Sequence, residues 1–192
     1  MCGDNKAQKL ATWLNFAKDN PRGYLYCFRG GLRSRTTQGW IQDAGLQYPL
    51  IKGGYKAMRR FLIDEIEKQS KELDFMVISG RTGTGKTRVL KRMPNFVDLE
   101  GLAHHRGSSF GRTLQDQPSQ IDFDNRVSID LLKARHQNKG TVFLEDESRL
   151  IGRCALPLPL KDTMTKCPIV VLETPLEQRI DVVVQDYVID MA

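Results

Sequence analysis

The octapeptide Gly80-Arg-Thr-Gly-Thr-Gly-Lys-Thr87 constrains the fold of this chain more than any other stretch of its sequence. It matches the pattern G-x-x-x-x-G-K-[ST] in full. It also lies between the apolar run "DFMVIS" and a helical pattern that begins at Lys86, which is the strand–loop–helix context that a phosphate-binding loop (P-loop) requires. An ordinary glycine turn is the alternative, and the motif and its context together favour the P-loop.

The positions of this motif have separate roles in holding phosphate. Gly80, Gly83 and Gly85 let backbone N–H groups converge on phosphate oxygens, and the N-terminus of the following helix adds the positive end of its dipole. Lys86 would neutralise the terminal phosphates, and Thr87 would hold a magnesium ion. The sequence therefore predicts a site for phosphate groups together with magnesium.

A partner acid for the magnesium ion is expected at the end of a neighbouring strand. The stretch "TVFLEDES" supplies Glu145, Asp146 and Glu147 directly after an apolar run. Alone, such a stretch could be a solvated strand end, but beside a P-loop it resembles a Walker B segment. Three adjacent acids leave the assignment open, and Glu145 and Asp146 are the first candidates for the metal.

Short β-rich runs alternate with helical patterns along the chain, which predicts an α/β fold with a mostly parallel sheet. Strands are expected in "GYLYC", "YPLIKGG", "DFMVIS", "NFVDLE", "TVFLE" and residues 168–173. Helices are expected over 7–18, 34–44, 55–71 and 119–137, from Lys86, and after a capping box formed by Thr174, Pro175 and Glu177. Residues 101–118 are expected to form a long functional loop.

A cysteine stands at the mouth of a second glycine-rich loop, in "CFRGGLRS", at the end of the expected strand "GYLYC". Cys27 to Arg33 has the spacing C-x5-R, and Ser34 follows. Such a loop can wrap backbone amides around a tetrahedral anion while Arg29 and Arg33 grip it, and we expect the positive surroundings, Arg35 included, to lower the pKa of the thiol. Cysteine phosphatases and rhodanese-type sulfurtransferases use this geometry. A buried cysteine beside a surface turn is the alternative.

The other cysteines and the bulk composition set the expected environment. Cys2, Cys27, Cys154 and Cys167 form no Cys-x-x-Cys pair and have no histidines at zinc-finger spacing, so neither a disulfide framework nor structural zinc is expected. The start lacks the apolar core of a signal peptide, and no apolar run approaches membrane-spanning length. We therefore expect a cytoplasmic, reducing location and no membrane partner. The formal net charge of +6 is compatible with a polyanionic partner such as nucleic acid.

Several longer stretches carry a resemblance to a known family. The segments "CFRGGLRS", "YPLIKGGYKAMR", "GRTGTGKT", "VDLEGLAHHRGSSFGRTLQ" and "LEDESRLIG" together resemble tRNA 2-selenouridine synthase, from about Trp13 to the last expected helix. That family joins a rhodanese domain to a P-loop domain. The resemblance implies a partial rhodanese-like unit over residues 1–72, followed by a P-loop NTPase-like parallel sheet over residues 73–192. The charged helix over 55–71 is expected to join the two.

The resemblance implies a transferase activity on tRNA. The family replaces sulfur by selenium in 2-thiouridine at the wobble position, using selenophosphate, through an S-geranylated intermediate made from geranyl diphosphate. Cys27 matches the rhodanese cysteine and would carry the selenium, while Gly80 to Thr87 match the P-loop. Selenophosphate is itself a tetrahedral anion, which suits the loop from Cys27 to Arg33.

This chain departs from the family pattern at both ends. The rhodanese domain of the family starts with further strands, and its P-loop domain is followed by a long helical region. The resemblance therefore implies a fragment that lacks both ends. Two alternatives from other classes stay open at this point: a P-loop nucleotide hydrolase or kinase in which Cys27 is incidental, and a non-catalytic remnant that binds tRNA or a phosphate ligand.

Overall fold

The computed structural model describes residues 3–107, 111, 113, 115–137, 139–185 and 189, and its architecture is α/β, as expected. The chain divides into two compact units, Met1–Phe61 and Leu62–Ala192. The division falls inside the long helix α3 (Gly54–Glu72), whereas the sequence analysis placed the boundary after residue 72. The helix is thus shared, its first turns belonging to one unit and its remainder to the other.

The first unit holds α1 (Gly3–Asp19), α2 (Leu32–Asp43) and the start of α3 around a small core. Apolar residues recur on α1 at helical spacing, and this stripe faces α2. The rings of Trp13 and Trp40 stack with centroids 6.2 Å apart. The core comprises buried Ala17, Ile41 and Tyr48, with partly buried Leu10, Trp13, Leu14, Leu25 and Leu46 packed against them.

The expected strands "GYLYC" and "YPLIKGG" are reduced to one isolated parallel bridge, between Leu25 and Leu50. The Leu25 amide donates to the Pro49 carbonyl at 2.8 Å, and the Ile51 amide donates to the Leu25 carbonyl at 2.9 Å. A strand is stabilised by pairing along its length, and no other described segment of this unit pairs with these residues. The expected rhodanese-like sheet is therefore not formed within the described part of the first unit.

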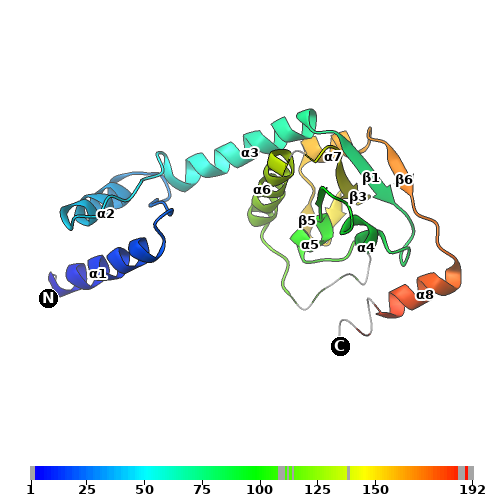
Figure 1. Ribbon diagram of the computed structural model, residues 1–192, viewed down its shortest axis with the longest axis horizontal. Coiled ribbons are helices and arrows are strands. Elements are labelled where there is room, and N and C mark those ends of the chain that lie inside the picture. The colour runs from blue at the N-terminus through cyan, green and yellow to red at the C-terminus, as the bar shows by residue number, and fades with distance from the viewer. Residues whose placement is uncertain are drawn as a thin grey trace. The chain divides into compact units, whose positions relative to one another are not determined.

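The second unit is built on a four-stranded parallel sheet with the order β2-β3-β1-β6. Its strands are β1 (Phe75–Ser79), β2 (Phe96–Val97), β3 (Val142–Glu145) and β6 (Ile169–Val171). The central strand β1 pairs with β3 from Phe75↔Val142 onward and with β6 from Val77↔Ile169 onward. Figure 1 shows β1 and β3 side by side and α6 beside the sheet. All four carboxyl ends consequently meet at one edge.

Helix α6 (Gln120–Gln137) supplies much of the core of this unit. Phe123, Val127 and Leu131 recur every four residues, so they share one face of the helix, and all three are fully buried. They belong to one cluster with Val77 and Leu144 of the sheet. The core therefore sits between the helix and the strands that carry the P-loop and the acidic segment.

Four elements of this unit were not expected from the sequence: the helix over Leu99–Ala103 (α5), α7 (Leu158–Met164), and the hairpin of β4 (Leu150–Ile151) and β5 (Cys154–Ala155). The side chain of Gln117 holds the hairpin in place. Its amide donates to the carbonyls of Ala103 at 3.1 Å and Ile151 at 2.9 Å, and its oxygen accepts from the Arg153 amide at 2.9 Å. The strands β4 and β5 have two residues each and α7 has seven, which is too short for a hydrophobic period to be recognised in the sequence.

Two expected elements end differently. The strand "NFVDLE" stops at Val97 because Asp98 caps α5 (Leu99–Ala103), its Oδ1 accepting from the Gly101 amide at 2.7 Å. The last helix, α8 (Leu176–Val184), has Pro175 as its N-cap and no side-chain cap, so the expected capping box is not formed. Instead, the Thr174 hydroxyl donates to the Thr84 carbonyl of the P-loop at 3.5 Å. The helix from Lys86, α4 (Lys86–Leu90), is short.

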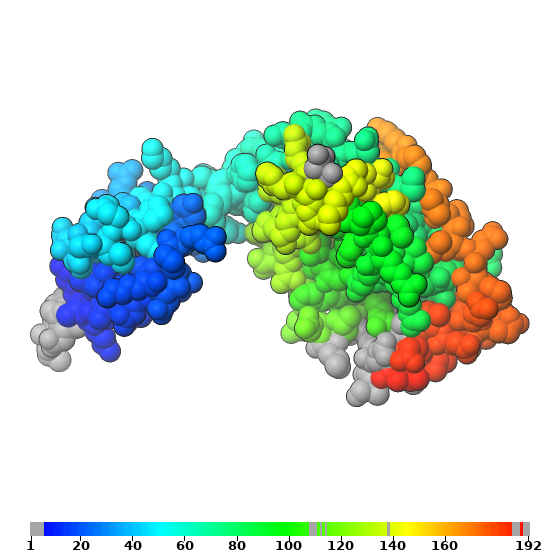
Figure 2. Space-filling model, in the orientation of Figure 1, coloured from blue at the N-terminus to red at the C-terminus, as the bar shows by residue number. Residues whose placement is uncertain are grey.

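The outer edge of the sheet is apolar and open to solvent. All three residues of β6 are exposed, and so are Leu176 and Ile180 of α8. Figure 2 shows the orange segment that contains β6 along the surface of this unit. No helix in the described part of the chain is both long enough and apolar enough to cross a membrane.

Candidate functional site

The P-loop connects the carboxyl end of β1 to α4, as the sequence predicts. Gly83 and Gly85 have φ angles of 83° and 80°, which favour glycine. At Gly83 the approach is also close, since an added Cβ would lie 2.5 Å from the Arg179 carbonyl oxygen of α8. Lys86 Nζ donates to the Gly80 carbonyl oxygen at 2.8 Å, so the lysine spans the loop that it follows.

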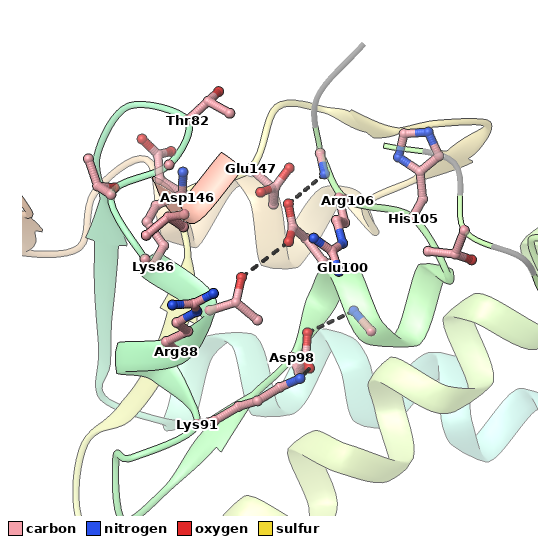
Figure 3. Close-up of a pocket in the computed structure, with 18 of the residues that line it drawn as sticks. Thr82, Lys86, Arg88, Lys91, Asp98, Glu100, His105, Arg106, Asp146 and Glu147 are labelled. Carbon is pink, nitrogen blue, oxygen red and sulfur yellow. Dashed lines mark hydrogen bonds and ion pairs between the residues drawn. The ribbon is translucent and has the colours of Figure 1, made fainter. Parts of the chain in front are cut away.

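A cavity of about 740 Å³ opens in front of this loop. Its walls come from the P-loop, α5, the loop after α5 and the loop after β3 (Figure 3). This volume lies in the range of sites for small ligands. The lining residues discussed below are Lys86, Thr87, Glu100, His104, His105, Gly107, Asp146 and Glu147.

The three adjacent acids after β3 have separate environments. Asp146 is exposed, and its Oδ2 accepts a hydrogen bond from the Ser79 hydroxyl at 2.7 Å. Glu145 is fully buried, and neither of its carboxylate oxygens has a hydrogen-bond partner within the described structure. Glu147 is 5% exposed and lines the cavity. Alternation along the chain thus separates Asp146 from the two glutamates.

The two buried glutamates have strongly raised pKa values. Burial raises the pKa of Glu145 to about 8, and the charge of Glu100 adds to that effect. The pKa of Glu147 is also raised to about 8, first by burial and then by the charges of Glu100 and Glu145. Lys86 acts in the opposite direction on both groups. At neutral pH these raised pKa values favour the protonated, uncharged form of both carboxyls, and a bound cation would favour their ionised form.

Glu100 joins this group from α5 and was not singled out by the sequence analysis. Its Oε2 accepts from the Thr87 hydroxyl at 3.3 Å, and its Oε1 accepts from the Gly107 amide at 2.5 Å (Figure 3). One carboxylate oxygen each of Glu100, Glu145 and Glu147 lies within 4.8 Å of the others. Glu100 follows the last residue of β2 by three positions, and this place in the sequence could have identified it. Because the carboxyl ends of parallel strands lie at the same edge of a sheet, an acid shortly after one strand can meet acids that follow another.

This oxygen-rich group fits a hard divalent cation such as magnesium. Of the residues expected to hold the metal, Glu145 belongs to the cluster of Glu100, Glu145 and Glu147. Thr87 contacts this cluster by donating a hydrogen bond to Glu100. Asp146 lies on the cavity wall but is engaged with Ser79. The choice among Glu145, Asp146 and Glu147 stays a prediction.

His104 and His105, in the segment 101–118 that was expected to be a functional loop, both line the cavity. His104 has a φ of 50°, its Nδ1 pairs with the Asp116 carbonyl at 3.0 Å, and its Nε2 accepts from Arg126 at 2.8 Å. Because a guanidinium can only donate, this contact requires the tautomer in which Nδ1 carries the proton and donates to the Asp116 carbonyl. Residues 108–110, 112 and 114 of the expected functional loop lie outside the described residues.

The second candidate site surrounds Cys27 in the first unit. An open cavity of about 360 Å³ is lined by Cys27, Phe28, Arg29, Gly31, Leu32 and Arg33. The Cys27 sulfur lies 3.2 Å from the Ser34 hydroxyl, which also donates to the Gly31 carbonyl at 3.1 Å. Ser34 has one hydroxyl proton, so it can serve either the sulfur or the carbonyl at a given moment.

The pKa of the Cys27 thiol is lowered from 9.0 to about 6. The Ser34 hydroxyl is the largest cause, burial opposes it, and backbone amides of Ser34, Gly31 and Arg29 add to the lowering. The expectation that arginine charge lowers this pKa is corrected: Arg29 and Arg33 are exposed, and hydrogen bonds lower the pKa of Cys27. By contrast, burial raises the pKa of both Cys154 and Cys167.

A pair of glycines explains how the Cys27 loop is held. The amides of Tyr55 and Lys56, at the start of α3, donate to the carbonyls of Cys27 and Phe28 at 3.0 Å each. A Cβ on Gly54, whose φ is 61°, would lie 2.0 Å from the Cys27 carbonyl oxygen. The glycines in "IKGGY" therefore allow the close approach of two backbones, a role that local spacing does not reveal.

Comparison with known proteins connects both sites to one family. Residues 73–192 match the model of the tRNA 2-selenouridine synthase AAA domain. A protein of Marinobacter nauticus named tRNA 2-selenouridine synthase is 61% identical over 186 residues, which cover 97% of this chain and 51% of that protein. Proteins of the same name from Pseudomonas syringae and Pseudomonas aeruginosa are 52% and 53% identical, covering 100% of this chain and 52% of each protein.

The chain therefore spans about half the length of the curated relatives it matches. No solved structure matches it.

Proposed function

The chain belongs to the tRNA 2-selenouridine synthase family, and from that membership we propose that it carries out part of the exchange of sulfur for selenium in tRNA. The substrate is wobble 2-thiouridine and the selenium donor is selenophosphate. The reaction makes the chain a transferase, with an S-geranylated thiouridine as intermediate. The observation that carries the proposal is the Cys27 thiol, whose lowered pKa stabilises the anionic, nucleophilic form within an anion-binding loop.

In this proposal the first unit is part of a rhodanese-like domain. The backbone amides between Cys27 and Ser34 bind the selenophosphate anion, Arg29 and Arg33 add positive charge at the cavity wall, and Cys27 carries the selenium. The Ser34 hydroxyl keeps the sulfur anionic by hydrogen bonding to it. The free cysteines favour a cytoplasmic, reducing location for this chemistry.

The P-loop, in the same proposal, binds the diphosphate of geranyl diphosphate. The thiouridine sulfur attacks the prenyl carbon, a carbon–sulfur bond forms, and the carbon–oxygen bond breaks to release diphosphate. Lys86 and the amides of the loop stabilise the charge that grows on this leaving group. A magnesium ion held by Thr87 and by Glu145 or Asp146 would supply further positive charge there.

The test is mass spectrometry of wobble-uridine nucleosides after incubation with 2-thiouridine tRNA, selenophosphate and geranyl diphosphate. Lys86→Ala should lower geranylation by about a hundredfold, as expected for one main electrostatic group, and spare selenium transfer to tRNA that is already geranylated. Cys27→Ser should do the reverse. Lys133→Ala and Cys167→Ser are the matched controls, since Lys133 is an exposed lysine of α6 and Cys167 has a raised pKa.

Two outcomes would contradict the proposal. Steady ATP hydrolysis without any modified nucleoside would favour a P-loop nucleotide hydrolase or kinase. Stabilisation by tRNA or phosphate ligands without product, in wild type and both variants alike, would favour a non-catalytic binding role.

A further inference from the structure

We propose that Glu100, Glu145 and Glu147 together bind one divalent cation of the magnesium or manganese class in the wall of the P-loop cavity. The inference deepens the proposed function, on which the role of the cation in the reaction rests. It adds Glu100, which lies on α5, to the metal ligands and leaves Asp146 out of them.

The environment of Glu145 indicates a bound cation. This side chain is completely buried, and neither of its carboxylate oxygens makes a hydrogen bond of ordinary geometry within the described structure. The Thr87 hydroxyl lies near enough to lower the pKa of Glu145, but its single proton is donated to Glu100 and cannot satisfy both oxygens. Buried polar atoms in native proteins are paired with few exceptions, and a buried carboxylate without a partner is strongly destabilising. One oxygen of Glu145 also lies within 4.8 Å of an oxygen of Glu100 and an oxygen of Glu147, so three acids converge on a position where a cation would be their partner.

Three separate chain segments bring the carboxylates together. Glu100 comes from α5, Glu145 ends β3, and Glu147 follows in the next loop. Because β2 and β3 are parallel neighbours, the segments that follow them meet at one edge of the sheet. Figure 3 shows Glu100 and Glu147 pointing toward the same space. The cluster thus results from the fold rather than from a local run of acids.

Two hydrogen-bond donors, one on each side, orient the Glu100 carboxylate. The Thr87 hydroxyl donates to Oε2 and the Gly107 amide donates to Oε1. Gly107 also lies so close to Glu147 that a Cβ there would be 2.1 Å from Oε2. Hydrogen bonds that fix a carboxylate in this way are typical of the surroundings of a metal ligand.

The donor set indicates which cation the site selects. Three carboxylates provide hard oxygen ligands, which suit magnesium or manganese rather than a metal that prefers sulfur. Glu100 and Glu147 line the cavity, so the cation would keep an open side for water or a phosphate oxygen. The Lys86 ammonium donates to the Gly80 carbonyl and makes no hydrogen bond to Glu145, so it does not take the place of the cation.

The test is a manganese titration of the whole chain, followed by the electron paramagnetic resonance signal of free Mn²⁺, near neutral pH and without nucleotide or diphosphate. We expect one bound Mn²⁺ per chain. Glu100→Gln and Glu147→Gln should each weaken binding by about tenfold or more, since each removes a negative charge from the ligand set but keeps the shape of the side chain. The control Glu67→Gln alters an exposed glutamate that pairs with Lys71, and it should bind Mn²⁺ like wild type.

Thermal unfolding supplies a second readout that does not depend on activity. Mn²⁺ should raise the melting temperature of wild type and Glu67→Gln, and raise that of Glu100→Gln by less, because stabilisation by a ligand of the folded state falls as its affinity falls. Circular dichroism without metal shows whether each variant is folded. Equal Mn²⁺ affinity in Glu100→Gln and wild type would overturn the assignment, and so would loss of Mn²⁺ on Asp146→Asn alone.

Lys86→Ala separates this inference from the proposed function. The variant lacks the cation that faces phosphate but retains all three glutamates, so it should still bind Mn²⁺. Manganese binding without any binding of geranyl diphosphate to wild type would leave the metal site standing and contradict the proposed function. Binding of geranyl diphosphate to wild type without Mn²⁺ binding would overturn the metal site alone.

Discussion

The Cys27 loop and the P-loop cavity both suit anions, but they control charge in opposite ways. At Cys27 a hydroxyl and backbone amides lower a pKa to about 6 at an open surface. In the P-loop cavity, burial and mutual repulsion raise the pKa of Glu145 and Glu147 to about 8. The two units also differ in their cores: among the described residues, the core cluster of the first unit has three buried residues and that of the second has sixteen. The larger unit buries the two glutamates and thereby raises their pKa values, whereas Cys27 is only partly buried.

The largest expected effect is on the stability of the second unit. Phe123→Ala removes a fully buried ring from its core and should lower the free energy of unfolding of that unit by about 3–5 kcal/mol. Both tryptophans of the chain, Trp13 and Trp40, lie in the first unit. Urea unfolding followed by tryptophan fluorescence should therefore keep its midpoint, while the circular dichroism transition moves to lower urea.

Ile41→Val is the matched change in the first unit and should lower its stability by about 0.5–1.5 kcal/mol, moving the fluorescence midpoint instead. If Phe123→Ala shifted the fluorescence and the circular dichroism transitions equally, the two units would unfold together. That result would contradict the separate stabilities expected for them.

Amide exchange should show the next largest contrast. The strand β1 is hydrogen bonded to a neighbour on each side, whereas Leu25 takes part in a single bridge. We expect amides of residues 75–79 to exchange about a hundredfold more slowly than those of residues 24–27, because opening of the bridge needs only local unfolding. Hydrogen exchange with mass spectrometry measures both segments in one sample. Equal protection would mean that the first unit closes its sheet by another route.

A smaller contrast concerns thiol reactivity and its dependence on pH. Since the pKa of Cys27 is lowered to about 6, its alkylation by iodoacetamide should rise with pH up to that value and level off above it. Cys154 and Cys167 have raised pKa values, so their rates should still be rising above pH 9. At neutral pH Cys27 should react at least about tenfold faster, as measured by peptide mass spectrometry.

Variants of the loop identify the cause of that reactivity. Ser34→Ala should move the midpoint of the Cys27 profile to higher pH, because it removes the largest cause of the lowering. Arg33→Gln should move it less, since arginine charge is not among the causes. The opposite ranking would restore the arginines as the main influence on the thiol.

Much of the second unit could be predicted from the sequence because its signals are local. The P-loop, β1, β3 and α6 are all found where the motif and the hydrophobic periodicity place them. The first unit was predicted less well. The alternation in "GYLYC" indicates a strand, but pairing partners decide whether a strand forms, and only Leu25 finds one. The short elements β4, β5 and α7 have patterns too brief to read.

The sequence by itself determined which local structures could form and which residue types were available: a glycine loop with Lys86 and Thr87, acids after a strand, and a cysteine before Ser34. These features depend on neighbours along the chain. The tertiary structure decided which acids meet, bringing Glu100 from another element to Glu145 and Glu147 and turning Asp146 to Ser79. It also decided that a hydroxyl rather than an arginine controls Cys27. Convergence of distant residues depends on strand order and burial, which no local pattern contains.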